Sequence, residues 1–233
     1  MSDKPVKFAI DGKEIPGRRG QTIMEAADEA GVYIPRLCYL KEVSPHGSCR
    51  VCVVNVNGRM QTACTQPIAE SITVENTTDE ITEMRKDLVD MLFVEGNHYC
   101  SFCEKSGNCE LQAVAYRLGI TAPKYPFLFP KREIDATHPD IFLDLNRCIL
   151  CARCVQASRD LDGKSVFEFV GRGADKTLTI NARARLSDTD LDITDKVVDV
   201  CPVGSILKKN TGFETPVGER IYDKAKIGSE IEK

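Results

Sequence analysis

The residues that can do chemistry in this chain are its eleven cysteines, which fall into three groups. The first group has the spacing C-x10-C-x2-C-x11-C, and the second has C-x2-C-x5-C with a histidine two residues upstream. The third has C-x2-C-x2-C followed, after 46 residues, by a Cys-Pro pair. Thiolates are the soft donors that hold iron–sulfur clusters. The spacings therefore predict three clusters and a chain that carries electrons.

Two of the groups supply four cysteines each, which is the number a cluster needs. We expect a [2Fe–2S] cluster on the first group, which comprises Cys38, Cys49, Cys52 and Cys64. We expect a [4Fe–4S] cluster on the third group, which comprises Cys148, Cys151, Cys154 and Cys201. Two-cluster ferredoxins carry one more cysteine at the position that Ser158 holds here. Ser158 is therefore not expected to bind iron, and one cluster is expected in this region.

The middle group supplies only three cysteines, Cys100, Cys103 and Cys109. A [4Fe–4S] cluster needs a fourth ligand, and His98 is the only other strong donor close by in the sequence. Because imidazole is neutral, a histidine ligand makes a cluster less negative and easier to reduce than a fourth thiolate does. The alternatives are a water, a carboxylate or a residue of a partner at the fourth iron.

Other uses of the cysteines fit less well. Zinc sites usually combine two separated CxxC pairs, and disulfide frameworks belong to short secreted domains with an even number of cysteines. The N-terminus has no apolar segment of the kind that directs export, and no apolar run approaches the roughly 18 residues of a membrane helix. We therefore expect a cytoplasmic protein without membrane contact. A formal net charge of −4 argues against nucleic-acid binding.

The elements that must position these cysteines predict an α+β protein in three lobes, each with a modest apolar core. Residues 1–78 predict a β-grasp [2Fe–2S] ferredoxin lobe, with hairpins at Asp11-Gly12 and Asn57-Gly58 and a capping box from Thr22 to Glu25. Residues 79–120 predict a small helical lobe, with one helix over 79–95 and another after Cys109.

Residues 121–214 predict a βαβ-type [4Fe–4S] ferredoxin lobe, entered through an extended proline-rich connector over 121–140. Its expected elements are a strand at IFLDL, a strand pair at VFEFV and TLTI, and a helix before Cys201. His46 and His138 are expected to be surface residues. Residues 215–233 are polar and predict a docking arm, with a frayed terminus as the alternative.

The order of the three sites resembles that in the N-terminal region of the large iron–sulfur subunit of respiratory NADH dehydrogenase. The stretches EGNHYCSFCEKSGNCELQA, HPDIFLDLNRCILCARCVQASRDLDG, CPVGSIL and TPVGERIYDKAKIGSEIE are most similar to the small diaphorase subunit of NAD-reducing nickel–iron hydrogenases. In the respiratory relatives the histidine stands four residues before the first middle cysteine, where this chain has Gly96. The spacing H-x-C is that of the hydrogenase diaphorase subunits.

The resemblance implies an electron-transfer subunit without a substrate site of its own. Hydride exchange with NAD requires a two-electron cofactor, and the sequence contains no G-x-G-x-x-G fingerprint. The resemblance implies that FMN and NAD bind to a partner flavoprotein subunit, and that the other partners are the small and large subunits of a nickel–iron hydrogenase. The same subunit in a formate dehydrogenase, a bifurcating hydrogenase or an NADH dehydrogenase is the first alternative. A structural metal-cluster scaffold is the second.

Overall fold

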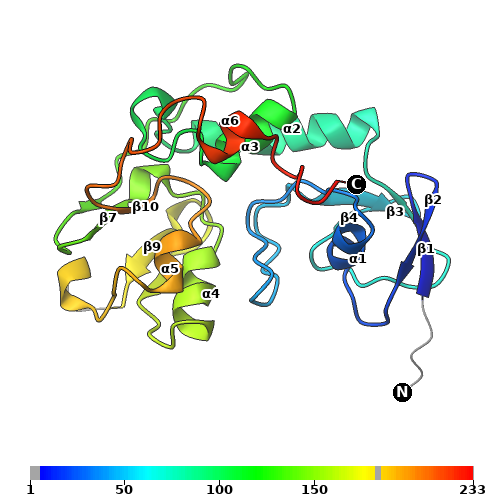
Figure 1. Ribbon diagram of the computed structural model, residues 1–233, viewed down its shortest axis with the longest axis horizontal. Helices are drawn as coiled ribbons and strands as arrows, with labels where there is room; N and C mark the ends of the chain where they lie inside the picture. The colour runs from blue at the N-terminus through cyan, green and yellow to red at the C-terminus, as the bar shows by residue number, and fades with distance from the viewer. Residues whose placement is uncertain (1–5, 182–184, 233) are drawn as a thin grey trace.

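The computed structural model describes residues 6–181 and 185–232 of the chain, which form a mixed helix-and-strand protein. In Figure 1 the N-terminal lobe lies on the right and the C-terminal ferredoxin lobe on the left, and the middle helices span the top between them. This arrangement confirms the predicted α+β fold class.

The N-terminal lobe is a five-stranded sheet covered by one helix, which is the predicted β-grasp arrangement. The strand order is β2-β1-β5-β3-β4, and β1 pairs in parallel with β5 while the other pairs are antiparallel. The elements are β1 (Val6–Ile10), β2 (Lys13–Gly17), α1 (Ile23–Glu29), β3 (Val53–Val56), β4 (Arg59–Thr62) and β5 (Thr73–Glu75). Both predicted hairpins form, and Thr22 and Glu25 make the predicted capping box of α1.

The middle lobe consists of two helices and the loop of cysteines between them. Helix α2 (Asp79–Val94) is capped at its N-terminus by Thr78, whose hydroxyl accepts a hydrogen bond from the Ile81 amide. A 3-10 turn follows at Cys100–Phe102, and α3 (Glu110–Arg117) starts directly after Cys109. The two predicted helices are therefore present, and they lie at either side of the middle cysteines.

The C-terminal ferredoxin lobe contains one three-stranded sheet, in the order β10-β7-β6, and one hairpin of β8 and β9. Its elements are β6 (Ile134–Asp135), β7 (Ile141–Asp144), α4 (Arg153–Asp160), β8 (Phe167–Val170), β9 (Thr177–Ile180), α5 (Lys196–Asp199) and β10 (Ile206–Lys208). The segment predicted as an extended connector differs from the expectation, because its last part forms β6 and pairs with β7.

The apolar core is divided into two clusters rather than into one for each lobe. One lies inside the β-grasp lobe and includes Ile15, Ile23 and Val54. The other is shared by the middle and C-terminal lobes. It also includes Cys38 and Cys49 of the first site. Small lobes bury little apolar area by themselves, which is why sharing a core stabilises them.

His138 is buried, so the prediction of a surface histidine was wrong. Its Nδ1 accepts hydrogen bonds from the amides of Asp140 at 3.1 Å and Ile141 at 3.2 Å, and its Nε2 lies 2.9 Å from the Leu191 carbonyl oxygen. The ring thus closes the turn that leads into β7 and ties it to the loop before α5. His46 is exposed, as predicted.

The C-terminal segment runs back over the middle lobe toward the β-grasp lobe (Figure 1). It contains one helical turn, α6 (Ile221–Lys224), which the sequence did not predict. Two backbone amides anchor it: that of Ile221 donates to Asn108 Oδ1 at 2.9 Å, and that of Tyr222 donates to the Gly107 carbonyl at 2.9 Å. The segment therefore packs against the chain's own middle cysteine loop.

Candidate iron–sulfur sites

The first site gathers four buried cysteines, of which Cys52 precedes β3, Cys64 follows β4, and Cys38 and Cys49 lie in the segment between α1 and β3. The sulfur of Cys38 contacts those of Cys49 and Cys64, and Cys64 also contacts Cys52. Hydrogen bonds from Cys49 and Cys64 hold the pKa of the Cys38 thiol below its usual range. The four cysteine sulfurs therefore lie together as one group, which fits the four thiolate ligands that a [2Fe–2S] cluster requires.

The middle site brings the four residues predicted for it around a single cavity. His98, Cys100, Cys103 and Cys109 all line this cavity, together with Phe93 and Gly204. Cys109 lies at the N-terminus of α3, and burial raises the pKa of its thiol to about 12. A buried thiolate needs a compensating positive charge, which iron would supply.

His98 is held in the form that can bind a metal. Its pKa is lowered to about 4, because burial and the nearby cations of Arg132 and Arg147 disfavour the imidazolium. Its Nε2 atom is buried and has no hydrogen-bond partner in the described part of the chain. An unpartnered buried nitrogen is costly unless it binds something. The donor set at the middle site therefore fits an iron–sulfur cluster with His98 as the fourth ligand.

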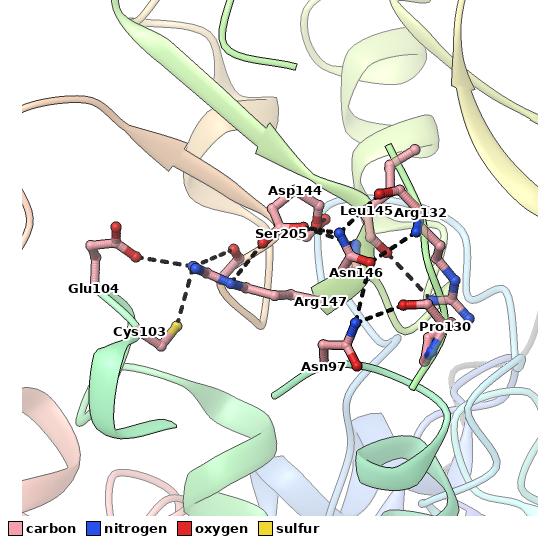
Figure 2. A network of polar contacts seen from close by, with 11 residues as sticks. Asn97, Cys103, Glu104, Pro130, Arg132, Asp144, Leu145, Asn146, Arg147 and Ser205 are labelled. Carbon is pink, nitrogen blue, oxygen red and sulfur yellow. Dashed lines mark hydrogen bonds and ion pairs between the residues drawn. The ribbon is translucent and has the colours of Figure 1, made fainter. Parts of the chain in front are cut away.

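Gly96, two residues before His98, leaves space for the His98 ring. A Cβ atom added to Gly96 would lie 2.6 Å from His98 Nε2 and 3.0 Å from the Asn146 carbonyl oxygen. A side chain at position 96 would therefore displace the His98 ring. Two hydrogen bonds of Asn97 fix the segment between Gly96 and His98. The Asn97 backbone amide donates to the Asn146 carbonyl at 2.8 Å, and Asn97 Nδ2 donates to the Pro130 carbonyl at 2.7 Å (Figure 2).

The third site places its four cysteines around an apolar cavity in the C-terminal ferredoxin lobe. Cys148, Cys151, Cys154 and Cys201 line it, with Phe169, Leu178 and Ile206 among their neighbours. Cys148 Sγ accepts a hydrogen bond from the Leu150 amide at 3.4 Å. Burial raises the pKa of the Cys148 thiol to about 11. Ser158 does not line this cavity, and its hydroxyl accepts a hydrogen bond from the Val166 amide at 2.7 Å.

Three non-glycine residues with a left-handed backbone lie in the loops that carry cysteines. Arg50, Leu150 and Ala152 have φ values of 61°, 53° and 66°, and each stands directly beside a cysteine of the first or third site. Residues other than glycine rarely adopt this left-handed region, and each such residue costs of order 1 kcal/mol. The strain lets amides between the cysteines turn inward toward the sulfurs, as the Leu150 amide does.

Sequence reasoning missed the charged residues that link the second and third sites. Arg153 precedes Cys154 and pairs with Glu110, which follows Cys109. Arg147 precedes Cys148 and reaches Cys103. Their only sequence signal is that each is a charged residue directly next to a cysteine.

Among the described residues, no group of three or more Cys, His, Asp or Glu side chains is arranged to hold a single metal ion.

Comparisons with known protein families match this division of the chain. Residues 3–79 match the 2Fe-2S iron-sulfur cluster binding domain, and residues 85–124 match the NADH-ubiquinone oxidoreductase-G iron-sulfur binding region. Residues 138–207 match the ferredoxin-like domain of NADH-quinone oxidoreductase subunit 3. The fold and the sites thus define an iron–sulfur protein with both 2Fe–2S and 4Fe–4S types of binding domain.

Individual relatives narrow this class further. The chain is 42% identical over 219 residues to the gamma subunit of the NAD-reducing hydrogenase HoxS of Cupriavidus necator, covering 94% of this chain and 93% of that protein. It is similar, with a TM-score of 0.91 and 47% identity, to a chain in the crystal structure of an NAD+-reducing [NiFe]-hydrogenase in the H2-reduced state, covering 94% of this chain and 93% of that one. The chain therefore belongs to the family of NAD-reducing hydrogenase gamma subunits, which confirms the resemblance noted in the sequence.

A longer relative shares the same region. The NADPH-Fe(3+) oxidoreductase subunit alpha of Geobacter sulfurreducens is 34% identical over 210 residues, which make up 89% of this chain but only 24% of that protein.

No helix within residues 6–181 and 185–232 has the length and apolar character needed to cross a membrane.

Proposed function

We propose that this chain relays single electrons between a flavoprotein subunit and a nickel–iron hydrogenase module within one assembly. The flavoprotein would carry FMN and exchange hydride with NAD, and the hydrogenase would consist of a small and a large subunit. The net reaction of the assembly is H2 + NAD+ = NADH + H+. The observation that carries this proposal is the set of three separate donor groups in a chain of the hydrogenase gamma family.

The cofactors would be one [2Fe–2S] cluster and two [4Fe–4S] clusters, which supply one-electron oxidation and reduction when bound. Cys38, Cys49, Cys52 and Cys64 would hold the first, His98, Cys100, Cys103 and Cys109 the second, and Cys148, Cys151, Cys154 and Cys201 the third. The protein's part is to fix the donors, to bury them among apolar side chains and to place N–H groups toward the sulfurs.

The assembly would be a cytoplasmic heteromultimer. The higher identity to the HoxS gamma subunit supports the hydrogenase role over the alternatives, because it is 42% over 219 residues, against 34% over 210 residues for the Geobacter relative. In the proposed assembly the boundaries of the functional segments are 1–78, 79–120, 121–214 and 215–233.

The proposal is tested by reconstituting hydrogen-driven reduction of NAD+. The chain would be produced with the flavoprotein and the two hydrogenase subunits, and the complex would be purified without oxygen. Leaving out this chain should abolish NADH formation from hydrogen. Hydrogen oxidation by an artificial dye, and NADH oxidation by a dye, should both persist in the separate modules. Unchanged NADH formation without the chain would contradict the proposal.

A further inference from the structure

Arg147 contacts Cys103 of the middle site (Figure 2) and lies beside the first cysteine of the third site in the sequence. Its Nη1 atom lies 3.6 Å from Cys103 Sγ, which belongs to the middle site. The residue itself directly precedes Cys148, the first cysteine of the third site. Nη1 also lies 3.3 Å from the carbonyl oxygen of Gly204, in the loop that follows Cys201. One guanidinium thus joins a sulfur of the middle site to both cysteine-bearing loops of the third.

The backbone leaves room for this contact at one glycine. A Cβ atom added to Gly204 would lie 2.6 Å from Cys103 Sγ and 3.3 Å from Arg147 Nη1. A side chain at position 204 would therefore push the sulfur and the guanidinium apart. The close approach is built into the fold and does not depend on a flexible surface arginine.

Two carboxylates hold the guanidinium in place. Glu104 Oε2 lies 3.0 Å from Nη1, and Asp144 Oδ2 lies 3.0 Å from Nε. The Arg147 side chain is only 19% exposed. An arginine guanidinium keeps its proton throughout the ordinary pH range, so the charge of Arg147 does not depend on these partners. A permanent positive charge is therefore held against one cysteine sulfur.

We propose that Arg147 is a positioning residue that raises the reduction potential of the middle cluster through its N–H contact with Cys103, an inference that rests on the cluster assignment above. Reduction adds one electron and one negative charge to the cluster, and Arg147 keeps its proton throughout. A charge-assisted hydrogen bond to the ligand sulfur stabilises the more negative, reduced state. Glu104 opposes this effect, because its carboxylate shares Nη1 with the sulfur.

An ion-pair role for Arg147 alone makes a different prediction. If the side chain only tied Glu104 and Asp144 together, its removal would change stability and leave the potential of the middle cluster where it was. The potential therefore separates the two roles, since hydrogen bonds to sulfur are among the factors that set it.

The experiment is a redox titration of the intact complex, followed by electron paramagnetic resonance. The middle cluster is identified as the one whose midpoint changes in His98→Cys. In Arg147→Gln its midpoint should fall by about 59 mV, the one-electron equivalent of a tenfold loss in the relative stability of the reduced state. Arg147→Lys retains the charge and should recover part of the shift. Lys105→Gln is the matched control, because it removes a cation from the loop that carries Cys103, and the described part of the chain shows no contact of Lys105 with a sulfur.

The outcomes are distinct. A midpoint in Arg147→Gln that equals the wild-type value, or that moves no more than in Lys105→Gln, overturns the inference. If Arg147→Gln does not fold, Glu104→Gln replaces it: freeing Nη1 should raise the midpoint, and an unchanged value overturns the inference. A wild-type complex without any [4Fe–4S] signal would refute the proposed function itself, whereas normal wild-type signals with unshifted variants refute only the role of Arg147.

Discussion

The Arg153 guanidinium and the Glu110 carboxylate form a two-point ion pair between the middle and third sites. Nη1 lies 2.6 Å from Oε1, and Nη2 lies 2.7 Å from Oε2. Arg153 is only 5% exposed, so its charge is compensated by this partner rather than by water. The Glu110 amide also donates to the Pro202 carbonyl at 2.8 Å. Each partner stands next to a predicted cluster ligand, and the pair therefore fixes the two sites relative to one another.

Removing one side of this pair should be costly. Glu110→Ala leaves the Arg153 charge buried without its carboxylate, and should lower the free energy of unfolding by about 3 kcal/mol. Glu83→Ala is the control, because the Glu83–Lys86 pair is exposed and should contribute less than about 0.5 kcal/mol. Anaerobic denaturant titration of both variants measures the difference. Equal losses in the two variants would contradict the structural role of Glu110.

Ser158→Ala should leave every cluster signal intact while weakening the fold. The Ser158 hydroxyl is fully buried and accepts the Val166 amide, so its loss should cost about 1–3 kcal/mol. Ser229→Ala removes a hydroxyl that hydrogen-bonds at the surface, and should cost less than about 0.5 kcal/mol. Loss of a [4Fe–4S] signal in Ser158→Ala would show that Cys201 is wrongly assigned.

Two isoleucines test whether the C-terminal segment is packed or frayed. Ile227 is 6% exposed and belongs to the shared core, whereas Ile221 in the same segment is 64% exposed. Ile227→Ala should therefore cost about 2–4 kcal/mol, and Ile221→Ala less than about 0.5 kcal/mol. Thermal unfolding of the two variants gives the comparison. If both behave as the wild type, the segment does not stabilise the chain.

His98 variants test the fourth ligand of the middle site. His98→Cys should retain a four-iron cluster with a lower midpoint, because a thiolate replaces a neutral donor. His98→Ala should expose one iron and give a three-iron signal after contact with air. His46→Ala, in an exposed loop, should match the wild type in both respects. An unchanged midpoint in His98→Cys, measured by redox titration, would show that His98 is not a ligand.

The local elements were predictable because their signals are local. Asp11-Gly12 and Asn57-Gly58 specify turns, and Thr22 with Glu25 specifies a helix start, whatever the rest of the chain does. The grouping of the cysteines could also be recognised, because the number of residues between cluster ligands is itself a sequence pattern. His138 was not, since its partner Leu191 lies 53 residues further on and only the folded lobe brings them together.

The contacts between sites were also beyond sequence reasoning. Arg147 meets Cys103 across 44 positions, and Arg153 meets Glu110 across 43. A charged residue beside a cysteine gives no indication of which distant sulfur or carboxylate it will reach. The C-terminal segment was predicted as a docking arm because it is polar, but polarity says nothing of Ile227, which is buried by the packing of other lobes.

The count of iron and acid-labile sulfide in anaerobically purified protein tests the central claim most directly. A chain with one [2Fe–2S] and two [4Fe–4S] clusters should contain about ten iron atoms and about ten sulfides. Zinc should be absent at stoichiometric levels. A value of about six irons would remove one four-iron cluster from the account, and stoichiometric zinc without sulfide would contradict it altogether.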